Sequence, residues 1–588
     1  MTGAHRFRGK HRALAGAFSA AFGFLGAATL TACAPHFGRI GTPRPAVVLR
    51  PLASAEAIRA DLRFLAHDLL EGRQPGTPGY DIAARYVAAQ FERTGVTPAG
   101  GAGSFLQPVR LLRYRAAAEP KLILREPGGR STPLTPGVDF GFHGWPVRPE
   151  ATFTARIVFA GFGITAPEFA RDDFAGLNLA GKIVVVIDGA PAGMKSDARS
   201  HYGAVAMKRV EAEKRGAVGL INIISLNADA GSSAGPPALS AMKSRGAAAP
   251  PPAPSRPWSL TWSSASGTPW FPGGEVVPVA RVDRSGVTKL FQGSPVSIDA
   301  IAAAARAPAG DVRGFELPSV AAVTVRTESE VVPSYNVAGL VQGTDPALRD
   351  QVIVVSAHLD HLGSQPPVKG DGIANGALDN ASGVAILLEI ARMLQVAPPR
   401  RPVLLVAFTG EEQGLLGADY FVRNPTVPQS SLVANINIDM PILTYEFTDV
   451  VALGAERSTI GAAVTRAAAR VGVAVTPAPA ALQGDFMRSD QYRFAQQGIP
   501  SVFLRTGYAN GGEAASAAFL ESCYHRACDD FSQPIDFVAA ARFARINYEI
   551  ARELADAPER PRWNAGEVFG KRIGRAAADA DSARSSRN

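Results

Sequence analysis

Five histidine and carboxylate residues in the second half of the chain have side chains that suit metal chemistry. They are His358, Asp379, Glu412, Asp439 and His525. Imidazole and carboxylate are the groups that bind zinc and similar divalent ions when no thiolate is offered. Two ions about 3.5–4 Å apart need a carboxylate between them and further ligands on each side. The set is large enough for this arrangement, so we predict a centre that holds two metal ions.

Two more acids adjoin the predicted ligands. Glu411 precedes Glu412 but points in a different direction, which suits a general base that takes a proton from a metal-bound water. Asp360 lies two residues after His358, on the same face of an extended chain, and is predicted to orient that imidazole. Taken singly, such acids are common helix caps or helix starts. Their coincidence at successive strand ends favours the catalytic interpretation.

The segments that must position these residues have the pattern of an α/β domain. Short apolar runs predict strands buried on both faces, at residues 352–355, 403–408, 434–438 and 500–504. Residues 383–395 have the pattern of an apolar helix. We therefore predict a mainly parallel mixed sheet sandwiched by helices. Sites in such folds form beyond the carboxyl ends of the strands, where the five ligands fall.

The chain is long enough, at 588 residues, for more than one domain. Residues 55–107 have a helical pattern, and short strands bounded by glycine follow at 156–163, 181–187 and 219–224, with a helix at 203–215 between the last two. Residues 228–256 are mostly Ala, Pro, Ser and Gly, which predicts a mobile loop. The predicted order is an N-terminal part of the α/β domain, an inserted β-rich domain, the main α/β domain and a polar tail, at 55–149, 150–300, 301–560 and 561–588.

The first 32 residues have the pattern of an export signal. A basic start is followed by an uncharged apolar stretch and by Leu30-Thr31-Ala32-Cys33, which resembles a bacterial lipobox. We predict a lipoprotein signal peptide, acylation of Cys33 and a linker over 33–54, with a plain signal peptide or membrane anchor as the alternative. The protein would be exported and held at a membrane, in the periplasm or at the outer membrane.

Composition excludes some other classes of function. Hydrophobic residues make up 46% and charged residues 19%, which is a normal globular balance and excludes a wholly disordered chain. The net charge is +8, half of it from Arg6, Arg8, Lys10 and Arg12. The remainder is mild and forms no basic stripe with aromatic residues, so we expect no nucleic-acid partner.

Together the motifs resemble those of the co-catalytic di-zinc exopeptidases, a family that includes secreted leucyl aminopeptidases and glutamate carboxypeptidase. The matching motifs are His358-x-Asp360, Gly376-Ala-x-Asp379-Asn-Ala-Ser-Gly383, Glu411-Glu412, Asp439-Met440 and Tyr524-His525. The segment Leu70-Glu71-Gly72-Arg73 also resembles the N-terminal part of that family, and residues 150–300 resemble an inserted protease-associated domain.

The resemblance implies a role for each ligand position. His358 and Asp439 would bind one zinc ion, Glu412 and His525 the other, with Asp379 between them and Glu411 as the base. It also implies a cis peptide after Asp379.

Several residues near these motifs leave alternatives open. Cys523 and Cys528 flank His525 and would form a disulfide in an oxidising compartment, as in some secreted relatives; two free thiols or a thiolate ligand are the alternatives. Many relatives have His where Gln491 stands, which puts assistance to the substrate oxyanion in doubt unless Tyr492 supplies it. His361 and His67 are predicted to be structural or to lie at the surface.

These observations predict a zinc-dependent aminopeptidase that acts on peptides. A carboxypeptidase or dipeptidase on the same fold is the alternative, since Arg488 or Arg505 would suit a substrate carboxylate. A glutaminyl cyclase and a non-catalytic binding protein are further alternatives. The sequence does not indicate the oligomeric state or the side-chain preference.

Overall fold

A computed structural model describes residues 51–224, 226, 257–368, 370–479, 482 and 484–570. These residues belong to one compact unit, Leu49–Asn588. The predicted signal peptide, Cys33, most of the linker, the predicted loop 228–256 and the end of the tail lie outside the described residues.

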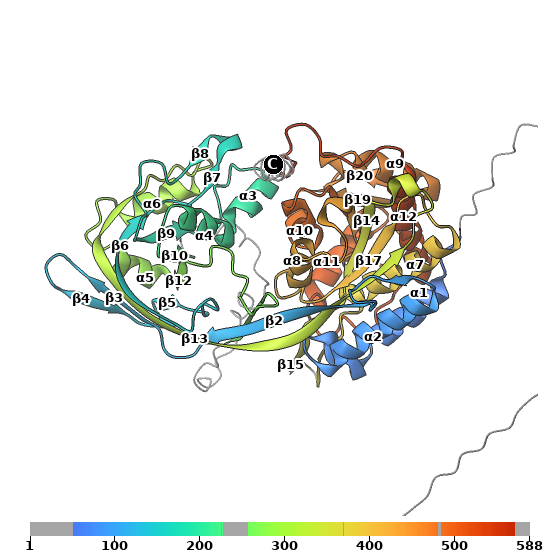
Figure 1. Cartoon of the computed structure of the whole chain (residues 1–588). Helices are drawn as coiled ribbons and strands as arrows, with labels where there is room; N and C mark the ends of the chain where they lie inside the picture. Colours follow the sequence, from blue (N-terminus) through green and yellow to red (C-terminus); the bar gives the residue numbers. More distant parts are fainter. Residues whose placement is uncertain are drawn as a thin grey trace, which may run out of the picture. The chain divides into compact units, whose positions relative to one another are not determined.

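The first sheet is mixed, and its centre is parallel (Figure 1). The parallel strands are β14 (Val352–His358), β17 (Val403–Phe408), β18 (Leu432–Asn437) and β21 (Ser501–Thr506). Antiparallel pairing adds β19 (Asp449–Leu453) beside β21 and β13 (Phe315–Val341) beside β17. The outer strands are β20 (Ala474–Thr476), β1 (Thr97–Pro98), β2 (Leu106–Ala116) and β11 (Ser259–Trp262). The predicted fold class is confirmed.

Apolar side chains cover both faces of this sheet. Ile353 and Val355 pack into one hydrophobic cluster, and Val352 and Val354 pack into another, because successive side chains of a strand point to opposite faces. Helices that contribute to the first cluster are α1 (Ala55–Leu65), α2 (Pro78–Arg93), α7 (Ser382–Val396), α9 (Ile460–Val471), α11 (Gly512–Ser522) and α12 (Phe537–Asp556). The second cluster takes side chains from α8 (Leu416–Arg423) and α10 (Gln491–Gln496).

The helical pattern predicted over residues 55–107 is only partly correct. Helix α2 ends at Arg93, and β2 begins at Leu106. Gly95 has a φ of 78°, and Val96 N–H donates to the carbonyl of Phe91, which is the geometry of a glycine stop at a helix C-terminus. The turn frees the following residues to pair with β13.

A second sheet shares the strand β13 with the first. The N-terminal half of β13 pairs with β3 (Lys121–Arg125) and β6 (Glu150–Phe159). Parallel strands β9 (Ile183–Ile187), β10 (Gly219–Ile223) and β12 (Val277–Val282) continue from β6, and β4 (Ser131–Leu134) and β5 (Phe140–Gly141) lie at the two edges. The helices are α3 (Ser196–Gly203), α4 (Val205–Lys214), α5 (Arg284–Leu290) and α6 (Ile298–Arg306).

We call residues 121–326 the second module. Its hydrophobic cluster runs from Leu122 to Val325, so the module extends beyond the segment 150–300 on both sides. Strands were predicted near β6, β9 and β10, and they are present. Its kinship with protease-associated domains stays a prediction.

Short elements complete the described chain. The paired strands are β7 (Thr165–Ala166) with β8 (Arg171–Asp172), and β15 (Gly363–Val368) with β16 (Asp371–Ala374). The short helices are η1 (Asp68–Arg73), η2 (Pro167–Phe169), η4 (Pro346–Leu348), η5 (Ala377–Ala381), η6 (Gln429–Ser431), η7 (Ala455–Arg457) and η9 (Asp485–Met487). Among the described residues, no helix combines the length and hydrophobicity that a membrane span requires.

Candidate metal centre

The carboxyl ends of the central strands deliver the predicted ligands to one place. His358 is the last residue of β14, and Asp439 follows β18 by two residues. Glu412 follows β17, and Asp379 lies in η5, just before α7. His525 comes from the loop after α11. The structure therefore brings all five predicted ligands together, as their positions after the strands had suggested.

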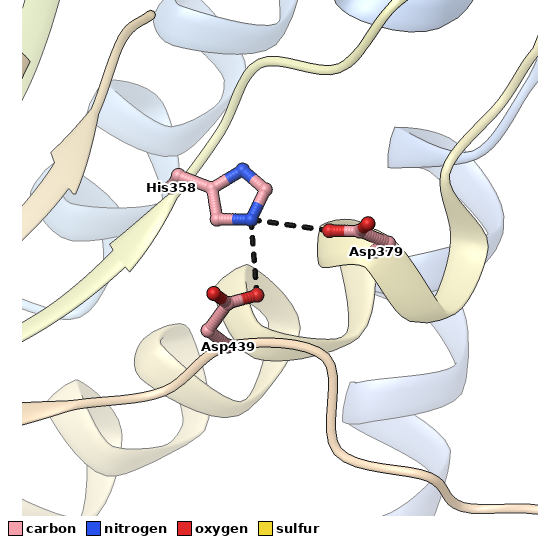
Figure 2. Close-up of side chains that lie close together, drawn as sticks. All are labelled: His358, Asp379 and Asp439. Atoms are coloured by element: carbon pink, nitrogen blue, oxygen red, sulfur yellow. Dashed lines mark hydrogen bonds and ion pairs between the residues drawn. The ribbon is translucent and has the colours of Figure 1, made fainter. Parts of the chain in front are cut away.

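The first group of donors is His358, Asp379 and Asp439 (Figure 2). The Nε2 atom of His358 lies 3.1 Å from Oδ1 of Asp439 and 3.2 Å from Oδ1 of Asp379. On the other side of the ring, Nδ1 donates to the main-chain carbonyl of Asp360 at 3.1 Å. That hydrogen bond leaves Nε2 unprotonated in the neutral ring and ready to bind a cation.

The second group uses the other oxygen of Asp379. The Nε2 atom of His525 lies 3.3 Å from Oδ2 of Asp379 and 3.1 Å from Oε2 of Glu412. Asp379 thus presents one carboxylate oxygen to each group, which is the placement that a bridging ligand needs.

A sixth side chain, His361, also reaches this group. Its Nδ1 lies 2.7 Å from Oε1 of Glu412, and the ring is completely buried. His361, Asp379 and Glu412 have donor atoms close enough together to hold one ion. The alternative that His361 lies at the surface is therefore wrong, whereas a structural role for it stays a prediction. The sequence signal was its position three residues after His358, at the same strand end.

Asp360 acts differently from the prediction. Its carboxylate does not contact the ring of His358; only its main-chain carbonyl does. The carboxylate instead accepts the N–H groups of Glu411 at 3.0 Å and Glu412 at 3.4 Å. The chain turns after His358, so the alternation of an extended strand no longer applies there. Asp360 therefore fixes the backbone of the Glu411–Glu412 pair.

Asp379 is held by residues that sequence reasoning did not identify. Asp529 accepts the N–H groups of Leu378 at 2.8 Å and Asp379 at 3.0 Å. The peptide bond from Asp379 to Asn380 is cis, as the resemblance implied. The side chain of Asn380 donates to the carbonyl of Ile438 at 2.9 Å and accepts Met440 N–H at 3.2 Å, so it joins the Asp379 and Asp439 loops.

Arg73 is a further residue that the sequence did not mark as part of the site. Its guanidinium is fully buried and donates to four main-chain carbonyls, those of Leu65, Leu359, Asn375 and Gly376. The carbonyls of Asn375 and Gly376 belong to the loop before Asp379, and the carbonyl of Leu359 directly follows His358. The guanidinium of Arg73 therefore connects the two loops that carry these predicted ligands. Burial lowers the pKa of Arg73 to about 10, and the nearby Asp360 and Asp529 oppose that change.

The electrostatics of the site favour a cation. Burial alone lowers the pKa of His525, but its contacts with Asp379 and Glu412 raise that pKa to about 10. Burial raises the pKa of Glu412, yet the neighbouring histidines lower it to about 2. Burial also lowers the pKa of His358, and Asp439 and Glu411 overcome that effect and raise it well above the usual range. Carboxylates that raise the pKa of both histidines this strongly create a negative environment, which fits a centre that binds divalent cations.

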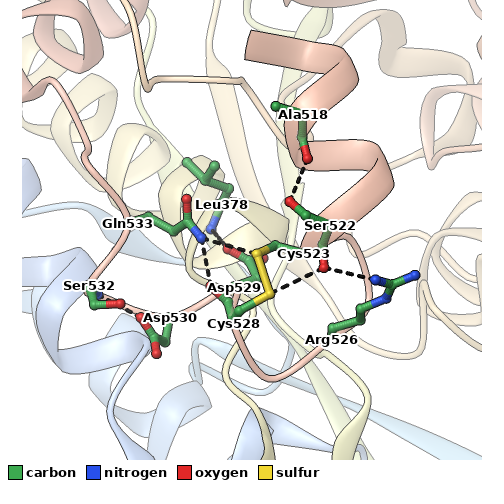
Figure 3. The surroundings of a disulfide bond; sticks show 10 residues. All are labelled: Leu378, Ala518, Ser522, Cys523, Arg526, Cys528, Asp529, Asp530, Ser532 and Gln533. Carbon is green, nitrogen blue, oxygen red and sulfur yellow. Dashed lines mark hydrogen bonds between the residues drawn. A yellow bond between two sulfur atoms is a disulfide. The ribbon is translucent and has the colours of Figure 1, made fainter. Parts of the chain in front are cut away.

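The loop that carries His525 is closed by a disulfide between Cys523 and Cys528 (Figure 3). Gln533 donates to the carbonyl of Cys528 at 2.6 Å, and Asp529 reaches back to the Asp379 backbone. Asp529 directly follows Cys528, so the loop that the disulfide closes around His525 is tied to Asp379, the residue that both groups of donors share. Of the alternatives left open, the disulfide is the one present in the structure.

A cavity of about 770 Å³ opens onto the centre. Its walls include Glu411, Asp439 and His525, and Met207 and Phe271 of the second module. One side-chain contact near this cavity joins the second module to helix α10, and another joins strand β11 of the first sheet to helix α8. His201 Nδ1 lies 2.6 Å from the hydroxyl of Tyr492, and Trp262 Nε1 donates to Asp419 at 2.8 Å.

Gln491 does not face the cavity as a substrate donor. It is fully buried, its Nε2 donates to the carbonyl of Phe486, and its Oε1 accepts from Asn437. Tyr492 does line the cavity. Arg505 forms an ion pair with Asp485 at 2.9 Å, whereas Arg488 is half exposed and 3.8 Å from the same carboxylate. His67 is exposed and caps η1, as expected for a residue outside the site.

The motif-bearing part of the chain matches a known family, and several known proteins are similar to parts of the chain. A sequence model of peptidase family M28 matches residues 336–551. A probable zinc metalloprotease of Pyrenophora tritici-repentis is 40% identical over 104 residues, which cover 18% of this chain and 23% of that protein. The aminopeptidase YwaD of Bacillus subtilis is 32% identical over 96 residues, covering 16% and 19%. Each match thus spans less than a quarter of the relative's length.

Among solved structures, an aminopeptidase from Aneurinibacillus sp. strain AM-1 is similar over most of the chain. It is 20% identical, with a TM-score of 0.46, and the match covers 86% of this chain and 95% of that one.

Proposed function

Residues 336–551 match peptidase family M28, and from this premise we propose that the protein is a two-zinc exopeptidase that removes N-terminal residues from peptides. The observation that carries the proposal is the carboxylate of Asp379, which offers one oxygen to His358 and the other to His525. Such a shared carboxylate is what a pair of ions requires. His358 and Asp439 would hold one ion, and Glu412 and His525 the other.

The residues around the centre divide the work of hydrolysis. When bound, the zinc ions lower the pKa of a water molecule and polarise the peptide carbonyl. Glu411 lines the cavity beside both groups of donors, where its carboxylate accepts the proton of the attacking water and later passes it to the departing amine. Burial raises the pKa of Glu411 well above its usual value, and bound cations oppose that shift. Asp360 keeps Glu411 in place through its backbone.

The arginines reduce the carboxypeptidase alternative to a single candidate, Arg488. A carboxypeptidase needs a cation for the terminal carboxylate of its substrate. Arg505 is already paired with Asp485, which leaves the more loosely paired Arg488 for that role. The name of one relative, the aminopeptidase YwaD of Bacillus subtilis, supports an aminopeptidase.

The test is mass spectrometry of peptides incubated with the full chain in detergent after zinc loading. Each peptide is supplied with a free and an acetylated N-terminus. We expect shortening from free N-termini only, and a loss of about 10²–10⁴-fold in kcat in Glu411→Gln with zinc content unchanged. Glu92→Gln, an exposed glutamate of α2, is the matched control. Loss of C-terminal residues from both forms would establish the carboxypeptidase alternative, and an active Glu411→Gln would remove the assigned base.

We further propose that the protein works outside the cytoplasm, held at a membrane by acylated Cys33. The basic start, the apolar stretch and the lipobox-like motif support this location. The disulfide between Cys523 and Cys528 is also typical of an oxidising compartment. Labelling of cells with a radioactive fatty acid should mark the wild-type protein and leave Cys33→Ser unlabelled.

A further inference from the structure

His361 has no role in the proposed hydrolysis, yet it lies at the heart of the centre. Its Nδ1 is 2.7 Å from Oε1 of Glu412, and its ring stands edge to face with that of His525, with 5.7 Å between their centroids. Gly376 leaves room for the ring, because a Cβ atom at residue 376 would come within 2.6 Å of the His361 ring. Gly376 has a φ of 59°, a conformation that glycine adopts without strain. The imidazole is therefore packed into a definite place.

The contact with Glu412 has the distance of a hydrogen bond but not its direction. Within the described part of the chain, neither ring nitrogen of His361 makes a hydrogen bond of good geometry, and Oε1 of Glu412 makes none either. A buried polar group without a partner is costly, so such groups are rare in folded proteins. The donor atoms of His361, Asp379 and Glu412 all lie close enough together to reach a single ion, and an ion there would supply both unpaired groups with a partner.

We propose that His361 is itself a ligand of the second metal ion, an inference that rests on the proposed two-metal function. The second ion would then have His361, His525, Glu412 and the shared Asp379. Four donors of this kind complete the tetrahedral set that zinc prefers in closed sites. The first ion would have only His358, Asp439 and the shared Asp379, which leaves a position open.

The two ions would therefore be unequal. The first ion, with its open position, is the one that accepts water or the substrate carbonyl and exchanges readily. The second ion, enclosed by four side chains, is retained and keeps Glu412 and Asp379 in position. A centre with the five predicted ligands alone gives each ion three protein donors and no such difference.

The experiment measures metal binding without reference to turnover. The full chain is loaded with zinc and dialysed against increasing concentrations of a chelator, and the zinc that remains is counted by elemental analysis. We expect the wild type to lose its ions in two separate steps. His361→Gln should lose the second ion at least about tenfold more easily, which is the loss that even an indirect partner of a ligand causes. His143→Gln, a partly buried histidine of the second module, is the control.

A second variant separates a ligand from a neighbour that only supports Glu412. In His361→Cys, a thiolate bound to cobalt(II) gives a sulfur-to-metal charge-transfer absorption band, which a residue outside the coordination sphere cannot give. Circular dichroism checks that each variant is folded. Appearance of the band supports the proposal even if no peptide is cleaved. Absence of the band in folded protein that binds two cobalt ions, or zinc release from His361→Gln that matches the wild type, overturns it.

Discussion

The carboxylate of Asp379 owes its position to neighbours that have no direct part in catalysis. Asp529 fixes its backbone, and Asn380 joins its loop to that of Asp439. Asp360 fixes the backbone of Glu411 and Glu412 by accepting their N–H groups. The centre thus depends on a layer of side chains that hold the main chain, a common property of metal sites.

Asp360→Asn tests this layer at a single residue. The amide keeps one acceptor oxygen but loses the other, so one of the two N–H groups at Glu411 and Glu412 loses its partner. We expect kcat to fall by about 10–100-fold, with KM nearly constant and zinc content retained. Asp81→Asn, in the first turn of α2, should behave as the wild type. Loss of zinc together with activity would show that Asp360 supports the ligands more than the base.

The ligand residues were predictable because their types and their places after apolar runs carry the information. Residue types do not fix the direction of a side chain at a strand end, because that direction depends on how the chain turns there. For this reason the sequence located Asp360 but misassigned its carboxylate, and it gave His361 no role at the centre.

At the scale of elements, η1 reaches the centre from far away in the sequence. Its last residue, Arg73, binds carbonyls more than 280 residues later in the chain, at Leu359, Asn375 and Gly376. Residues 336–551, which match the family, do not include it. A search limited to the motif-bearing segment therefore misses an element on which the geometry of that segment depends.

Arg73→Lys is the sharpest test of this dependence. A lysine keeps the charge but cannot reach four carbonyls in the fixed directions that a guanidinium provides. We expect weaker zinc binding and a drop of about 10–100-fold in kcat, with KM little changed. Arg63→Lys, on the exposed side of α1, is the control. A variant that unfolds at the wild-type temperature and keeps full zinc affinity would contradict this role.

The disulfide loop gives a second prediction at this scale. Reduction of Cys523–Cys528 should release the loop that carries His525. Because His525 is a proposed ligand of the second ion, the affinity for that ion should fall more than the affinity for the first. The measurement is the amount of zinc released while the protein is titrated with a reductant that does not bind metal. Cys523→Ala/Cys528→Ala should reproduce the reduced state without any reductant. Equal loss of both ions, or none, would argue against a specific link to His525.

The central strands were predictable because they are short, apolar and bounded by polar or glycine residues. The end of the helical region was not, because Gly95 stops α2 through its backbone conformation, while the residues after it still fit a helical pattern. The extent of the second module was also missed, since the hairpin of β3 and β4 joins the rest of its sheet only when residues 320–324 of β13 lie beside β3.

At the scale of the whole described chain, the second module completes the cavity over the metal centre. Met207 and Phe271 line the cavity together with Glu411 and His525. We expect a wall built by a separate module to limit the length of peptide that enters the cavity. Substrate size would then depend on how the module is held against the rest of the chain.

Trp262→Phe tests the part of the cavity wall that β11 of the first sheet supports, because Trp262 stacks on Trp270, which lines the cavity. The variant keeps most of the ring but loses the indole N–H that donates to Asp419 at 2.8 Å, a bond worth about 1.5–3 kcal/mol because one partner is charged. We expect the ratio of kcat/KM for long peptides to that for dipeptides to rise, and the free energy of unfolding to fall. Trp258→Phe is the matched control, because Trp258 lies over Arg113 and Arg115 and not over the cavity. An unchanged length preference would show that the cavity wall does not select substrates.

The strand β13 also has a consequence for how the protein is made. It pairs Val337 with Leu106 and Val323 with Leu122, so β2 and β3 lack this neighbour until residues more than 200 positions later join them. Such distant pairings slow folding and keep sheet edges exposed meanwhile. The N-terminal half therefore forms no complete sheet by itself. Both sheets are completed only when β13 joins them, and until then their exposed edges favour aggregation.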